Sequence, residues 1–131
     1  VLAAVETVNA TMPATLDAAA LTVMAARGQI TGALVDGPLA FDNAISPEAA
    51  ATKGITSQVA GEADILVVPD LEAGNMLAKQ LIYFAGATAA GLVLGARVPI
   101  VLTSRADPLS ARIASAALAK LVAVRKAEGK A

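Results

Sequence analysis

Four polar side chains gather at positions 103–107, directly behind an apolar run that has strand character. They are Thr103, Ser104, Arg105 and Asp107, and a helix-like pattern begins at Pro108. A hydroxyl donor beside a guanidinium, just before a helix start, suits an anion, because the helix dipole also favours negative charge there. These residues therefore predict a site for phosphate or a developing oxyanion, with Ser104 and Arg105 as donors.

Two members of this group also have structural interpretations. Asp107 followed by Pro108 is typical of a helix N-cap with a first-turn proline, and we favour the cap over a role as general base. Arg105 could instead pair with Asp36 or Asp42, and the residues alone leave both alternatives open.

The composition excludes several kinds of chemistry. The chain has 131 residues with no His and no Cys, so it cannot form disulfides, a Cys/His zinc site or a Ser-His-Asp triad of its own. Proton transfer must fall to carboxylates, Lys, Tyr or the substrate. A net charge of −1 and 2% aromatic residues favour neither nucleic acid nor a membrane as partner. A cytoplasmic location fits a chain without cysteine.

The elements that must position these residues follow an α/β pattern. We expect one α/β unit over residues 1–131, with a mostly parallel sheet flanked by helices. Strands are expected at 1–5, 31–37 and 65–68, an ordered loop at 38–45, and helices at 13–28, from 46, at 71–86 and from 108. Two further apolar runs, 89–96 and 98–104, predict a strand hairpin before the last helix. That helix carries one apolar stripe, formed by Leu109, Ile113, Ala116, Ala117, Leu121 and Val124.

The longest uncharged stretch covers residues 80–96. It is shorter than the roughly 20 residues that a membrane span needs. Because Gly86, Gly91 and Gly95 interrupt it, we expect a helix end, a turn and a buried strand instead.

Polar residues follow three of the predicted strands. Ligands of open α/β sheets bind at the carboxyl ends of strands, so we expect substrate there. The candidate substrate-binding residues are Asp36, Asp42, Asn43, Asp70, Gly74, Asn75 and Thr103. Structural interpretations compete, since Asp70 is a candidate cap and Gly74 a candidate close-packing position. Asp36, Asp42, Asp70 and Glu72 could together attract Mg²⁺, but scattered carboxylates more often accept loop amides, so we expect no metal site.

Three motifs stand in an order that resembles the phosphate acetyl/butyryltransferase family. They are DGPLAFDNAI (36–45), VAGEADILVVPDLEAGN (59–75) and GARVPIVLTSRAD (95–107). The form LTSRAD is closest in look to the phosphate butyryltransferase branch and to the transferase domain of enoyl-CoA hydratase fusions. The resemblance implies a fold like that of the isocitrate and isopropylmalate dehydrogenases, with two α/β domains around a cleft. This chain would be the C-terminal part, with the N-terminal domain absent.

The same resemblance implies reversible acyl transfer between acyl-CoA and inorganic phosphate in a ternary complex. Coenzyme A and acyl phosphate would be substrates, no cofactor would be permanently bound, and a homodimer is expected. Arg105 would bind the phosphate, and Ser104 would donate to the carbonyl or phosphate oxygen. Ordinary acetyltransferases carry an aspartate where this chain has Ala111. Asp107 could replace it as base, the base could lie elsewhere, or little base catalysis could be needed.

Two other classes of function compete with the enzyme. One is a non-catalytic acyl-CoA-binding regulatory module, like the transferase-like domain of some malic enzymes. The other is a structural fragment that associates through exposed sheet edges and apolar faces. Ser104 and Arg105 favour catalysis, whereas Ala111 leaves the regulatory alternative open.

Overall fold

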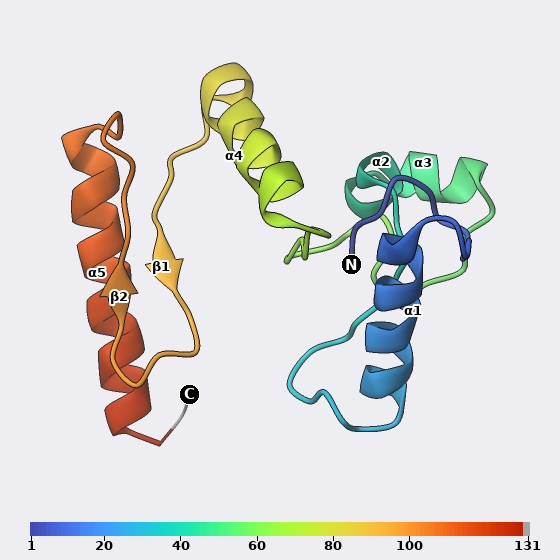
Figure 1. Cartoon of the computed structure of the whole chain (residues 1–131), viewed down its shortest axis with the longest axis horizontal. Coiled ribbons are helices and arrows are strands. Elements are labelled where there is room, and N and C mark those ends of the chain that lie inside the picture. Colours follow the sequence, from blue (N-terminus) through green and yellow to red (C-terminus); the bar gives the residue numbers. More distant parts are fainter. Residues whose placement is uncertain (130–131) are drawn as a thin grey trace. The chain divides into compact units, whose positions relative to one another are not determined.

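The computed structural model describes residues 1–129, which form two compact units, Val1–Met76 and a second that begins at Leu77. Figure 1 shows the elements along the chain. The first unit contains α1 (Pro13–Ala26), α2 (Phe41–Ile45), α3 (Pro47–Thr52) and the start of α4 (Leu71–Ala85). The second contains β1 (Leu92–Val93), β2 (Ile100–Val101) and α5 (Leu109–Ala127).

Three backbone segments lie side by side in the first unit. The amide of Leu39 donates to the carbonyl of Val1 at 3.0 Å, and the amide of Ala3 donates to the carbonyl of Leu39 at 2.9 Å. This is the pattern of a parallel bridge between Leu2 and Leu39. On the other edge, the Leu2 amide donates to the Val67 carbonyl at 2.8 Å. The segment that begins the chain therefore pairs on one side with Val67, in a predicted strand, and on the other with Leu39, in the segment predicted as a loop.

Of the expected strands, 1–5 and 65–68 do not extend beyond these bonds, and no strand forms at 31–37. Among residues 1–129 the only strands are β1 and β2, and they form an antiparallel pair. A continuous parallel sheet consequently stays a prediction, supported by the single parallel bridge. A strand forms a regular hydrogen-bond ladder only where a neighbouring strand runs alongside it. Here the backbone hydrogen bonds between the segments stop after a few residues.

Local signals place most helix ends correctly. Pro13 occupies the first turn of α1, and Gly28 beyond its C-terminus has a φ of 73°, a conformation that glycine adopts without strain. The side chain of Ser46 accepts a hydrogen bond from the Ala49 amide at 3.2 Å, which confirms the predicted cap of α3. Gly86, with a φ of 66°, follows the end of α4.

The segment predicted as an ordered loop contains a helix instead. α2 begins after Ala40, whose backbone is extended, and its first turn holds Asp42. A carboxylate there interacts favourably with the positive end of the helix. The prediction was wrong because five residues are too few to show a helical period in the sequence.

The predicted hairpin is confirmed in the second unit. β1 and β2 pair antiparallel with Leu92 opposite Val101. Both strands pack against α5, beside which they lie in Figure 1. The connection covers residues 94–99 and is therefore longer than the expected tight turn, and the strands are shorter than the predicted 89–96 and 98–104.

Small residues of α5, not its large apolar ones, make this contact. Ala111 and Ser115 are buried, and the Ser115 hydroxyl accepts from the Gly91 amide at 2.9 Å and donates to the Ala111 carbonyl at 2.7 Å. A Cβ on Gly91 would meet the Leu102 carbonyl oxygen at 2.6 Å, so close packing requires glycine. The helix can approach the hairpin closely because its facing residues are short.

The apolar stripe predicted on α5 is largely exposed in the described part of the chain. Leu109, Ile113 and Leu121 are 72%, 60% and 63% exposed. A stripe in the sequence shows which helix face is apolar, but it does not show which face the neighbouring strands cover.

Residues 80–96, the uncharged stretch, divide between the end of α4, a turn and β1. Leu92 of β1 is half-buried and Val93 is exposed. None of the helices in the described part of the chain has the length and apolarity to cross a membrane.

Candidate functional site

Residues 104–107 form a tight turn between β2 and α5. The Asp107 amide donates to the Ser104 carbonyl at 3.1 Å, and the Asp107 carboxylate accepts from the Ser104 amide at 2.7 Å. The Ser104 hydroxyl lies 3.4 Å from the Ala106 amide, from which it accepts. These bonds bind the two ends of the turn to each other and fix the position of Ser104.

Asp107 does not cap α5, and the predicted capping role is therefore wrong. The N-cap position belongs to Pro108, whose backbone is extended and whose carbonyl accepts from the amides of Ala111 and Arg112. The carboxylate of Asp107 instead accepts a hydrogen bond from the Ser104 amide. Its role is to order the turn that carries Ser104.

Arg105 lies at the tip of the turn with an exposed side chain. Within its own unit it makes no hydrogen bond or ion pair with any residue that the structure describes. Thr103, half-buried, precedes the turn. An exposed guanidinium on a hydrogen-bonded turn, next to a hydroxyl, is an arrangement that can receive an anion.

A second polar cluster lies in the first unit and contains two of the predicted residues. The Lys53 ammonium lies 3.1 Å from the Glu6 carboxylate and 3.4 Å from the Asp42 carboxylate. Asn43, with no exposed surface, donates from Nδ2 to the same Glu6 oxygen at 3.4 Å. Its Oδ1 is buried and has no hydrogen-bond donor among residues 1–129.

The charges in this cluster stabilise one another. The hydrogen bond from Lys53 lowers the pKa of Glu6, assisted by a backbone hydrogen bond. A hydrogen bond from the Asn43 backbone lowers the pKa of Asp42, and Lys53 lowers it further. The same contacts, the one with Glu6 first, raise the pKa of Lys53. All three groups are therefore charged at neutral pH.

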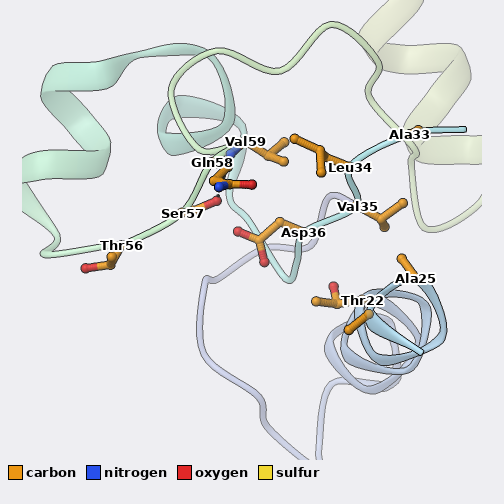
Figure 2. Close-up of a pocket in the computed structure, with 11 residues that line it drawn as sticks. Thr22, Ala25, Ala33, Leu34, Val35, Asp36, Thr56, Ser57, Gln58 and Val59 are labelled. Atoms are coloured by element: carbon orange, nitrogen blue, oxygen red, sulfur yellow. Dashed lines mark hydrogen bonds between the residues drawn. The ribbon is translucent and has the colours of Figure 1, made fainter. Parts of the chain in front are cut away.

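Asp36 lies in an open hollow of about 290 Å³. Figure 2 shows its carboxylate between Thr22 of α1 and the segment that carries Ser57 and Gln58. One carboxylate oxygen accepts from the Gly37 amide at 2.8 Å. The hollow therefore combines an acidic group with hydroxyl and amide side chains.

The predicted residues at 70–75 are explained mainly by structure. The Asp70 carboxylate accepts from the Ala73 amide at 2.7 Å, which confirms Asp70 as the cap of α4. A Cβ on Gly74 would lie 2.8 Å from Cγ2 of Val68, which supports a close-packing role. Asn75 is exposed on the helix surface.

The structure brings together only some of the predicted residues. Asp42 and Asn43 share one cluster, whereas Ser104, Arg105 and Asp107 belong to the other unit. The sequence analysis missed Glu6 and Lys53. Glu6 directly follows the apolar run at 1–5, so its position after a predicted strand was the signal that could have identified it. No pattern in the sequence marks Lys53 in the same way.

The scattered carboxylates do not form a metal site within the described part of the chain. No three of them lie close enough together to hold an ion among residues 1–129.

Comparison with known proteins gives the family. The model of the family described as "Phosphate acetyl/butaryl transferase" matches residues 1–120. Phosphate acetyltransferase of Rickettsia felis is 69% identical over 122 residues, which are 93% of this chain and 35% of that protein. Probable phosphate butyryltransferase of Bacillus subtilis is 61% identical over 118 residues, covering 90% of this chain and 40% of that protein.

A solved structure agrees with the sequence matches. The crystal structure of a branched-chain phosphotransacylase from Enterococcus faecalis V583 aligns with a TM-score of 0.78 and 40% identity, covering 91% of this chain and 42% of that one. The chain thus belongs to the phosphate acetyl/butyryltransferase family, which confirms the resemblance carried by the three motifs. It spans less than half the length of these relatives.

Proposed function

We propose that this chain is part of an enzyme that transfers an acyl group reversibly between coenzyme A and inorganic phosphate. The observation that supports the proposal most strongly is its 61% to 69% identity to proteins named phosphate butyryltransferase and phosphate acetyltransferase. These names favour catalysis over the non-catalytic acyl-CoA-binding alternative.

In the proposed reaction, the sulfur of coenzyme A attacks the carbonyl carbon of an acyl phosphate. A carbon–sulfur bond forms, the bond between carbon and the phosphate oxygen breaks, and phosphate leaves. Arg105 binds the phosphate and offsets its charge, while the Ser104 hydroxyl donates to the oxygen that gains charge. The hydrogen bonds within the turn support this role, because they hold Ser104 in place before substrate arrives.

Asp107 is our candidate to accept the thiol proton. One of its oxygens accepts from the Ser104 amide, and the other has lone pairs for a second donor. This assignment gives Asp107 two tasks, ordering the turn and receiving the proton. Ala111 cannot share the second task, because it has no titratable group and is buried.

The remaining substrate contacts are assigned to the turn at 104–107, to the polar cluster around Lys53 and to the segments beside them. We propose that Asp36, Asp42, Asn43, Asp70, Gly74, Asn75 and Thr103 contribute to binding, with coenzyme A as substrate and no permanently bound cofactor. The enzyme would act in the cytoplasm as a homodimer, with a second α/β domain of isocitrate-dehydrogenase-like fold completing the cleft and the parallel sheet.

The experiment is an acyl-transfer assay of the full-length enzyme that contains this chain. It follows thioester formation from coenzyme A with acetyl phosphate and, separately, butyryl phosphate. We expect turnover with at least one, and a loss of about 100-fold in kcat for Ser104→Ala. Ser110→Ala, an exposed serine on α5, is the matched control and should retain activity. Binding of coenzyme A without turnover would instead support the regulatory alternative.

A further inference from the structure

The charged cluster around Lys53 links segments that are far apart in the chain. Glu6 follows the first backbone segment, Asp42 and Asn43 open α2, and Lys53 stands at the C-cap of α3. One ammonium bonds both carboxylates, 47 and 11 residues away in sequence. The cluster therefore fixes the start of α2 relative to the first segment of the unit.

Stability alone does not account for this arrangement. Lys53 and Glu6 keep about a third of their side-chain surface exposed, and exposed ion pairs contribute little to folding. Asn43 is fully buried, yet its Oδ1 finds no donor among the described residues, which costs free energy. The ion pair therefore adds little to stability, and the buried Asn43 oxygen subtracts from it.

Glu6 decides how the Asn43 amide is oriented. Nδ2 donates to the Glu6 carboxylate, and rotating the amide by half a turn would place Oδ1 against that negative charge. Lys53 in turn holds Glu6 at 3.1 Å and Asp42 at 3.4 Å. The side chain of Asp42 keeps 56% of its surface exposed, so it is the member best able to meet a ligand.

The charge of the cluster selects the kind of ligand. Two carboxylates and one ammonium leave one net negative charge, which repels phosphate and favours a group with N–H or O–H donors. Of the two substrates, coenzyme A carries such donors in the amides and hydroxyl of its uncharged pantetheine arm, apart from the phosphates of its nucleotide end, whereas acyl phosphate carries none at neutral pH.

We propose that Glu6 and Lys53 are positioning residues that hold Asp42 to accept a hydrogen bond from the pantetheine arm of coenzyme A. This inference rests on the proposed function, because it assigns one of that reaction's two substrates to this cluster. Acyl phosphate binds elsewhere, at a site that carries free positive charge.

Steady-state kinetics of the full-length enzyme test the inference with the variants Lys53→Met, Glu6→Gln and Lys53→Arg. We expect Lys53→Met and Glu6→Gln to raise the KM for coenzyme A about 10-fold or more while leaving the KM for acyl phosphate unchanged. Lys53→Arg should restore most of the affinity. Glu48→Gln, which removes an exposed carboxylate of α3 that bonds neither Lys53 nor Glu6 in the described part of the chain, is the control and should change neither constant.

The double variant Glu6→Gln with Lys53→Met should raise the KM for coenzyme A no more than Lys53→Met alone, because Lys53→Met already breaks the Lys53–Glu6 contact that Glu6→Gln removes. An unchanged KM for coenzyme A, or equal changes for both substrates, would overturn the inference. Calorimetric titration with coenzyme A gives a readout that does not require turnover. If the wild type binds coenzyme A but transfers no acyl group, the proposed function fails, while weaker binding by Lys53→Met still supports the inference.

Discussion

Ser115→Ala is the change whose effect can be worked out most fully from the contacts of the second unit. The Ser115 hydroxyl is completely buried and joins α5 to the hairpin, because it accepts from the Gly91 amide at 2.9 Å. Alanine removes the acceptor and leaves that N–H without a partner. The hydroxyl's own bond to the Ala111 carbonyl is lost as well.

An unsatisfied buried donor costs about 1–3 kcal/mol. Gly91 is half-buried, so water can partly replace the lost acceptor, and we expect the lower part of this range, about 1–2 kcal/mol. Since 1.4 kcal/mol is a factor of ten in an equilibrium constant, the hairpin should separate from α5 roughly ten times more often. The turn at Ser104 follows β2 directly, so its order should fall too.

Amide hydrogen exchange measures this effect at the residue concerned. The protection of the Gly91 amide should fall about tenfold in Ser115→Ala. Ser110→Ala on the exposed face of the same helix should change protection by less than about 0.5 kcal/mol. Equal protection of Gly91 in the two variants would refute the reasoning that the buried hydroxyl holds the hairpin on α5.

Two further predictions concern the first unit. Gly74→Ala should lower the free energy of unfolding by about 1–3 kcal/mol, because its Cβ would lie 2.8 Å from Cγ2 of Val68; denaturant unfolding should show partial recovery when Val68→Ala is added, and additive losses would contradict the contact. The pKa of Glu6 lies below its ordinary value of 4.5, mainly through the hydrogen bond from Lys53, so the ion pair stabilises the fold above that pH and is lost as pH falls through the lowered pKa. The stability difference between wild type and Glu6→Gln, from thermal melts, should therefore vanish once the pH falls below the lowered pKa of Glu6, and a difference that persists in strong acid would disprove this origin.

The sequence predicted those features that depend on neighbouring residues. Ser46 and Asp70 cap their helices as expected, because a capping side chain reaches an amide three residues ahead in either case. Gly28 ends α1 because glycine adopts a positive φ without strain. The hairpin was likewise visible as two apolar runs with a short connection.

Features that depend on competing or distant partners were not predictable. Asp107 stands directly before a predicted helix start, so the sequence favoured a cap, and only the folded turn shows that its carboxylate accepts from the Ser104 amide. Glu6 and Lys53 are 47 residues apart, so no local pattern could pair them. The apolar stripe of α5 was visible in the sequence, but small residues such as Ala111 face the hairpin instead.

The central claim is that Arg105 binds the phosphate of the transferred acyl phosphate. Arg105 has no partner among the described residues of its own unit, so Arg105→Ala should leave the free energy of unfolding within about 0.5 kcal/mol of wild type. Arg125→Ala, in the last turn of α5, is the matched control.

The decisive measurement is the kcat/KM for acyl phosphate in the full-length enzyme carrying Arg105→Ala. The account predicts a fall of about 100-fold or more, with Arg105→Lys recovering only part of it because lysine lacks the planar fork of donors. Arg125→Ala should match wild type. An Arg105→Ala enzyme with unchanged kcat/KM would contradict the account.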